Sequence, residues 1–72
     1  MTKKYIELNT FLNIKGIATS GGNAKHIIRN EEVKVNGNVE TRNKRKLFAS
    51  DVIEYDSETF EVLEEECKKT LE

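Results

Sequence analysis

The sequence predicts an α+β domain in which two helices pack on a small, mainly antiparallel sheet of short strands. Apolar residues recur at helical spacing as far as about Asn30, and beyond it they alternate with polar residues as in strands. Asn36-Gly37 stands between two alternating runs and is the strongest short signal of a β-hairpin. We expect residues 1–72 to form one domain with its core at about residues 5–63.

The first helix is predicted at about residues 8–15. Leu8, Phe11 and Leu12 follow helical spacing. Gly16 ends the helix, because glycine most easily takes the left-handed conformation at a helix C-terminus. The next residues, 17–19, are too few for anything but a tight corner between two helices.

The second helix is predicted at about residues 21–30, with Ser20 as its N-terminal cap. Its apolar face repeats at three-and-four spacing in Ala24, Ile27 and Ile28. Gly21 and Gly22 weaken helix formation by about 1 kcal/mol each relative to alanine. We therefore interpret them as a place where a backbone or a phosphate comes close.

Strands are expected at residues 33–35, 38–40, 52–55 and 59–63, with the basic arm, residues 41–46, as a strand or a loop. Residues 64–72 read as an acidic, frayed tail, and Leu71-Glu72 is a pair often left by cloning. The predicted core is Ile6, Leu8, Phe11, Leu12, Ile17, Ala24, Ile27, Ile28, Val33, Val35, Val39, Leu47 and Val52.

The net charge of −1 conceals an asymmetric distribution. Residues 1–46 hold ten Lys or Arg and four Glu, whereas residues 47–72 hold two Lys and nine Asp or Glu. A basic face attracts polyanions even on a nearly neutral protein. No apolar run is long enough for a bilayer span or a signal peptide, so we expect a cytoplasmic protein.

The residue types of common active sites are scarce. Cys67 is the only cysteine and His26 the only histidine, so neither can assemble a metal site with others of its kind. We expect Cys67 to be an exposed free thiol and His26 to lie at the surface. No nucleophile with a base or phosphate-loop pattern is present, and we expect no enzyme, cofactor, metal or small-molecule substrate.

Cations cluster in a way that suits nucleic-acid phosphates. Lys25 and Arg29 are four residues apart on one helix face, Lys15 closes the first helix, and the basic arm carries four cations within five residues. No aromatic residue lies within the arm, which argues against a base-stacking, single-strand binder and favours a folded backbone. The predicted RNA-binding residues are Lys15, Ser20, Gly21, Gly22, Lys25, Arg29, Arg42, Lys44, Arg45 and Lys46.

The order of several motifs resembles a known family. These are Leu8-x-x-Phe11-Leu12, Gly16-Ile17-Ala18-x-Ser20, Ala24-Lys25-x-x-Ile28, Val33-x-Val35-Asn36-Gly37, and Lys46-Leu47 followed by Asp51-Val52-Ile53. Together they resemble the S-four RNA-binding domain, named for ribosomal small-subunit protein four, over about residues 5–55. The resemblance implies a two-helix (alpha-L) motif packed on a small sheet, with RNA lying across the helices and adjoining loops.

Within that family the chain is most similar to short stand-alone proteins of the YaaA/YbcJ type, which share Ser20-Gly21-Gly22 and Glu40-Thr41-Arg42. Two positions depart from the family pattern. Many members carry arginine where this chain has Gly21, and many carry glycine where it has Ser50.

The leading hypothesis is a monomeric, non-catalytic binder of structured RNA, either ribosomal or transfer RNA, with the ribosome as a further partner. A second hypothesis is duplex DNA binding, because two helices around a tight corner also suggest a helix-turn-helix motif. A third is a protein-interaction adaptor that uses the acidic strand face at Glu54, Glu58 and Glu61.

Overall fold

The computed structural model describes residues 3–71 and confirms the α+β class. Helix α1 spans Leu8–Ile14 and helix α2 spans Gly21–Arg29. The strands are β1 (Lys3–Glu7), β2 (Val33–Val35), β3 (Asn38–Val39), β4 (Lys46–Leu47), β5 (Val52–Tyr55), β6 (Glu58–Glu61) and β7 (Lys69–Leu71). One turn of 3-10 helix, η1 (Glu64–Glu66), precedes β7. Glu72, half of the expected cloning pair, lies outside the described residues.

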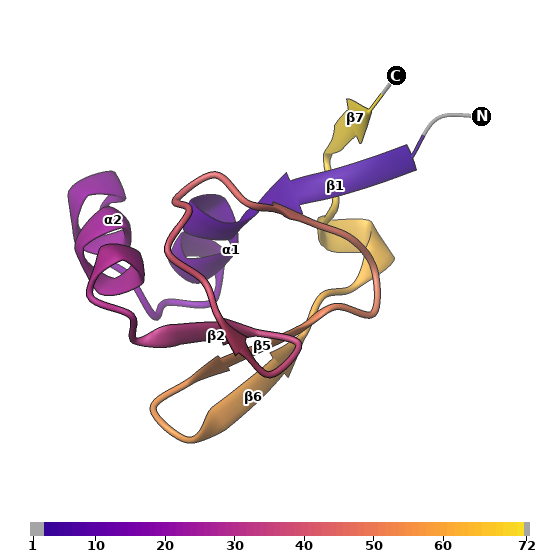
Figure 1. Ribbon diagram of the computed structural model, residues 1–72. Helices are drawn as coiled ribbons and strands as arrows, with labels where there is room; N and C mark the ends of the chain where they lie inside the picture. The colour runs from indigo at the N-terminus through magenta and orange to yellow at the C-terminus, as the bar shows by residue number, and fades with distance from the viewer. Residues whose placement is uncertain (1–2, 72) are drawn as a thin grey trace.

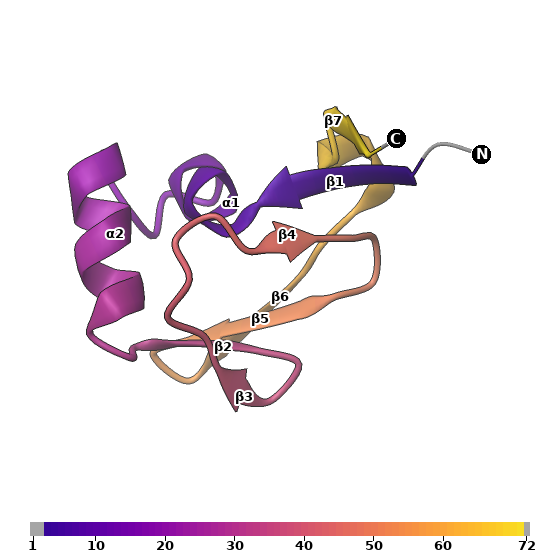
Figure 2. The same cartoon turned by 45° about the horizontal axis from the view of Figure 1, so that its top comes forward.

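The described strands form two antiparallel sheets where one was expected. Their orders are β4-β1-β7 and β3-β2-β5-β6. Helix α2 packs on α1, and both helices lie toward the same end of the two sheets (Figure 1, Figure 2). The two helices are therefore together at one end of the molecule, and each sheet forms a separate surface.

Local sequence signals set the ends of both helices. Gly16 follows α1 with φ of 75°, the left-handed conformation expected of it. Oγ of Ser20 accepts a hydrogen bond from the backbone amide of Asn23 at 3.0 Å, and Oδ1 of Asn23 accepts from the amide of Thr19 at 3.0 Å. This reciprocal cap confirms the predicted start of α2.

The β2–β3 hairpin turns at Asn36-Gly37 as predicted. Both residues have positive φ, 51° and 87°, which two-residue hairpin turns of this kind require. Oδ1 of Asn36 also accepts a hydrogen bond from the backbone amide of Val52 at 2.9 Å. The turn residue therefore ties the hairpin to the start of β5.

The core matches most of the prediction, but two residues were wrongly included and Ala18, Ile53, Val62 and Cys67 were missed. The buried apolar residues are Ile6, Leu8, Phe11, Leu12, Ala18, Ala24, Ile27, Ile28, Val33, Val35, Leu47, Ile53, Val62 and Cys67, with Ile17 partly buried against them. Val39 and Val52 were wrongly placed in the core, being 47% and 39% exposed. Ile53 lies opposite Val35 and shares its buried face, so Val52 beside it must point the other way.

The C-terminal segment is not the frayed tail that was expected. Strand β7 pairs with the edge of β1, where Tyr5 lies opposite Lys69. The thiol of Cys67 is buried, with 4% of the residue exposed, and Sγ lies 3.6 Å from the carbonyl oxygen of Leu63. The expectation of an exposed thiol was wrong because a single buried residue among charged ones leaves no periodic signal.

Within residues 3–71, none of the helices is long and apolar enough to cross a membrane. Over the same range, His, Cys, Asp and Glu side chains nowhere gather in a group of three or more that could hold a metal ion.

Candidate nucleic-acid interface

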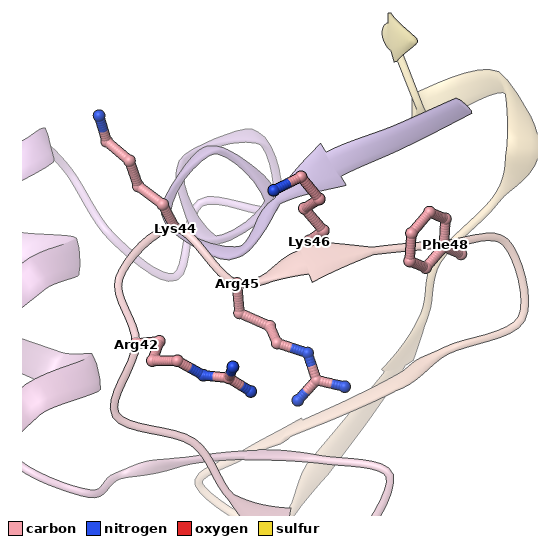
Figure 3. A pocket seen from close by; sticks show the side chains of 5 residues that line it. All are labelled: Arg42, Lys44, Arg45, Lys46 and Phe48. Carbon is pink, nitrogen blue, oxygen red and sulfur yellow. The ribbon is translucent and has the colours of Figure 1, made fainter. Parts of the chain in front are cut away.

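The basic arm and Phe48, the residue after β4, line one open pocket of about 460 Å³. Its lining residues are Arg42, Lys44, Arg45, Lys46 and Phe48 (Figure 3). Figure 3 shows the two guanidinium groups on one side of the arm and the two ammonium groups on the other. The four cations that the sequence placed in one segment therefore also share one cavity.

A single buried carboxylate, Glu40, holds both guanidinium groups. Nε and Nη2 of Arg42 donate to its two oxygens at 2.9 and 3.1 Å, and Nη1 of Arg45 donates at 2.6 Å. The backbone amide of Arg42 donates at 3.0 Å. The Arg42 side-chain hydrogen bonds, with help from that amide and Arg45, lower the pKa of Glu40 to about 2 despite its burial. Glu40 therefore remains ionised at neutral pH and fixes the arm.

The backbone of the arm is also tied to helix α1. The amides of Leu8 and Asn9 donate to the carbonyl oxygens of Arg45 and Asn43 at 2.9 and 3.0 Å. The first N–H groups of a helix have no partner within it, so the arm satisfies donors that would otherwise be left unpaired. The basic arm is thereby an irregular segment of defined shape.

The pocket keeps most of its positive charge and many of its donors. One carboxylate among four cations leaves a net charge of +3. A guanidinium group has five N–H donors, of which Arg42 uses two and Arg45 uses one on Glu40. The remaining donors are available to an anion in the pocket.

The predicted helical cations are exposed but do not join the pocket. Lys25 and Arg29 lie on the solvent side of α2, and neither is among the residues that line the pocket. Ser20, Gly21 and Gly22 are exposed at the start of the same helix. A Cβ added at either glycine would meet nothing within 4 Å, so the backbone there is open to an approaching group.

Lys15 is already engaged within the protein. Its Nζ lies 2.6 Å from Oε2 of Glu66 and 5.4 Å from the ring centroid of Phe11. Burial raises the pKa of Glu66, but the hydrogen bond and charge of Lys15 and the amide of Leu63 outweigh that effect and lower it. Sequence reasoning treated Lys15 as a free cation because it had assigned Glu66 to a frayed tail.

A family model described as the S4 domain matches residues 1–63 of the chain. The chain belongs to this family. The matched residues include both helices, the β2–β3 hairpin and the basic arm. The 3-10 turn η1 and strand β7 lie beyond them.

Several curated relatives resemble this S4-domain chain. A Bacillus subtilis (strain 168) protein named "Probable ribosome maturation protein RlbA" is 41% identical over 49 residues, or 68% of this chain and 69% of the relative. An Escherichia coli (strain K12) protein named "Putative RNA-binding protein YbcJ" is 34% identical over 59 residues, or 82% and 84%. "Uncharacterized protein YbcJ" of Shigella flexneri matches to the same extent.

The two departures from the S4-domain pattern have different structural consequences. Gly21 has no positive φ, so its backbone conformation does not demand glycine. Ser50 has a φ of 79°, a left-handed conformation that glycine adopts at lower cost. The turn at Ser50 is formed, but with a residue poorly suited to it.

Sequence reasoning missed two aromatic residues of this S4 domain. Phe48 lines the pocket with the arm, and Tyr5 lies beside it with ring centroids 6.3 Å apart. Tyr5 is remote from the arm in sequence and reaches it only because β1 pairs with β4. The available signal was alternation, since Tyr5 and Phe48 each adjoin one of the paired, buried residues Ile6 and Leu47.

Proposed function

We propose that this protein is a monomeric, non-catalytic module that binds structured RNA, either ribosomal or transfer RNA. Membership of the S4-domain family supports the class of ligand. One relative is named as a ribosome maturation protein and another as an RNA-binding protein, which supports a partner among the RNAs of translation.

The observation that carries the proposal is the basic arm fixed by Glu40. Its guanidinium groups are oriented before any ligand arrives, since both are hydrogen-bonded to one buried carboxylate. Preorganised cations lose less side-chain entropy on binding than mobile ones do. A pocket of net charge +3 with spare guanidinium donors suits phosphate oxygens, which accept bidentate hydrogen bonds from arginine.

Helix α2 supplies a second basic surface outside this pocket. Lys25 and Arg29 supply exposed charge, and the open backbone at Gly21 and Gly22 lets a phosphate approach the first amides of the helix. Ser20 shapes that turn through its cap to Asn23. A folded RNA presents phosphates at several angles at once, which a surface made of an arm and a helix end can match.

Binding of an RNA hairpin and of a DNA duplex of equal length, measured in competition over a range of salt concentrations, tests the proposal. The variant Lys44→Gln with Lys46→Gln removes two pocket cations that have no ion pair among the described residues. It should weaken hairpin binding and reduce the log–log salt slope by about 1.4 to 1.8. Arg42 and Arg45 are poorer targets, because their removal leaves Glu40 buried without its partners.

The matched control is Lys34→Gln with Lys68→Gln, which removes equal charge from two exposed positions outside the pocket. A control that weakens binding as much as the pocket variant would overturn the proposed surface. Preference for the DNA duplex would overturn the RNA assignment in favour of the helix-turn-helix hypothesis.

A further inference from the structure

The outer face of the β4-β1-β7 sheet carries two aromatic rings and two lysines. Ile6 and Leu47 are directly paired and both point into the core. Because side chains alternate along a strand, Tyr5 and Phe48 stand next to each other on the opposite face. We call the four residues Lys3, Tyr5, Lys46 and Phe48 the aromatic–lysine face.

Each ring of this face lies under a lysine of the other segment, because Lys3 of β1 covers Phe48 and Lys46 of β4 covers Tyr5. Nζ of Lys3 is 4.2 Å from the ring centroid of Phe48, and Nζ of Lys46 is 5.5 Å from that of Tyr5. Both lysines are exposed and both rings are half-buried. The rings are held by the sheet, whereas the long lysine side chains over them are free to move.

Phe48 borders two hollows at once. It lines the pocket of the basic arm, and it also lines a hollow of about 450 Å³ that is bordered by Lys3 and Lys4 and by the carboxylates of Asp51 and Glu64. The aromatic–lysine face is therefore continuous with the basic arm. A ligand whose phosphates follow the arm would carry its next units onto these rings.

We propose that the aromatic–lysine face holds an unpaired nucleotide of the RNA that the basic arm binds, with its base stacked on Tyr5 and its edge against Phe48, whose ring plane is inclined by 57° to that of Tyr5. This inference rests on the proposed function. The chemistry is complementary in both respects, because a nucleotide joins a flat apolar ring to an anionic phosphate and the face joins aromatic rings to cations. Paired bases within a helix are stacked on each other, so only an unpaired base can offer its flat face.

Lys3 and Lys46 must leave the rings when the base binds. A cation over a half-buried aromatic ring that still faces solvent is held more weakly than a stacked base. As the base covers the rings, Lys3 and Lys46 move from them to the flanking phosphates, where they neutralise charge. The face thus offers a stacking site and its counter-charges from the same two strands.

The experiment uses one RNA hairpin in three forms at a fixed salt concentration: blunt, with a short single-stranded adenosine extension, and with an abasic extension of equal length. The abasic extension keeps the phosphates and lacks the bases. We expect the adenosine form to bind about tenfold more tightly than the abasic form. The variant Tyr5→Leu, which leaves every residue lining the pocket of the basic arm in place, should abolish that difference and still bind the blunt hairpin.

Phe60→Leu is the matched control, since Phe60 is a partly buried aromatic on β6, in the other sheet. It should keep the tenfold difference. A second readout avoids changing the rings: Tyr5 and Tyr55 are the only tyrosines and tryptophan is absent, so in Tyr55→Phe the emission comes from Tyr5. The adenosine extension should quench it and the abasic one should not.

The outcomes separate the two proposals. If the hairpin binds in all three forms but the adenosine and abasic extensions behave alike in affinity and in Tyr5 emission, the stacking site is overturned and RNA binding stands. If none of the three forms binds, the proposed function itself is overturned.

Discussion

Oε1 of Glu40 lies 2.6 Å from Nη1 of Arg45, which is five positions further along the chain. The same carboxylate takes two hydrogen bonds from the Arg42 side chain, so the arm bends around a buried negative charge. Glu40 is an acidic residue among the cations that would bind phosphates, and its role is therefore to position them. It gives up one unit of net charge and orients two guanidinium groups.

Replacing Glu40 with glutamine should destabilise the protein. Glu40→Gln keeps the shape but loses the charge that three side-chain hydrogen bonds depend on. We expect the free energy of unfolding to fall by about 2 kcal/mol, and the melting temperature by about 10 °C in a domain of this size. Thermal unfolding followed by circular dichroism measures both. The exposed Glu58 is the control position, and a Glu58→Gln variant that loses as much would contradict the assignment.

Stability should depend on acid pH through the same carboxyl. The Arg42 hydrogen bonds lower the folded-state pKa of Glu40 to about 2 from an ordinary 4.5, so the unfolded chain takes up its proton at higher pH. The contribution of Glu40 is then fully present above about pH 4.5 and is lost as the pH falls toward about 2. Urea unfolding at a series of pH values should show this decline, and Glu40→Gln should flatten it. An equal decline in both proteins would refute the role of Glu40.

Releasing Lys15 should strengthen RNA binding. In Glu66→Gln the carboxylate 2.6 Å from Nζ of Lys15 becomes neutral, which leaves the lysine available to a phosphate. We expect tighter binding of an RNA hairpin and a log–log salt slope steeper by up to about 0.8. Glu65→Gln makes the same charge change at a neighbouring exposed residue. Identical effects of the two variants would mean that net charge alone is responsible.

The thiol of Cys67 should be protected in the native protein. Burial, and after it the charge of Glu66, raises the pKa of Cys67, and both effects slow reaction of the thiol. Labelling with a thiol-specific disulfide reagent should accelerate about tenfold or more in denaturant. Thr70→Cys in a Cys67→Ala background supplies an exposed thiol for comparison. Equally fast labelling of the two native proteins would show that Cys67 is accessible.

Glycine at position 50 should stabilise the protein. Ser50 pays the steric cost of a φ of 79°, which glycine avoids. The gain exceeds the added flexibility of the unfolded chain, so we expect Ser50→Gly to raise the free energy of unfolding by about 0.5 kcal/mol. Ala49→Gly, next to it and without a positive φ, should lower stability instead. Chemical denaturation of both variants would decide, and loss of stability in Ser50→Gly would be the contrary result.

Local signals in the sequence determined both helices and the first hairpin. Ser20, Gly16 and Asn36-Gly37 act within a few residues of where they stand, through caps and turn conformations that depend on the backbone nearby. The apolar periodicities likewise predicted most of the core. The position of the basic arm could also be predicted, because its four cations lie in one continuous segment.

The tertiary structure alone decided which partners these residues meet. Strand pairing brought β7 to the edge of β1, placed Tyr5 beside Phe48, and turned Ile53 rather than Val52 inward. Folding also joined Lys15 to Glu66 and Arg45 to Glu40. Contacts between distant residues depend on register and on which edges remain free, and neither is encoded in the spacing of one segment. The sequence determined that a basic surface exists. The tertiary structure decided that Glu40 orients its arginines, that Glu66 pairs with Lys15, and that Lys46 lies over an aromatic ring.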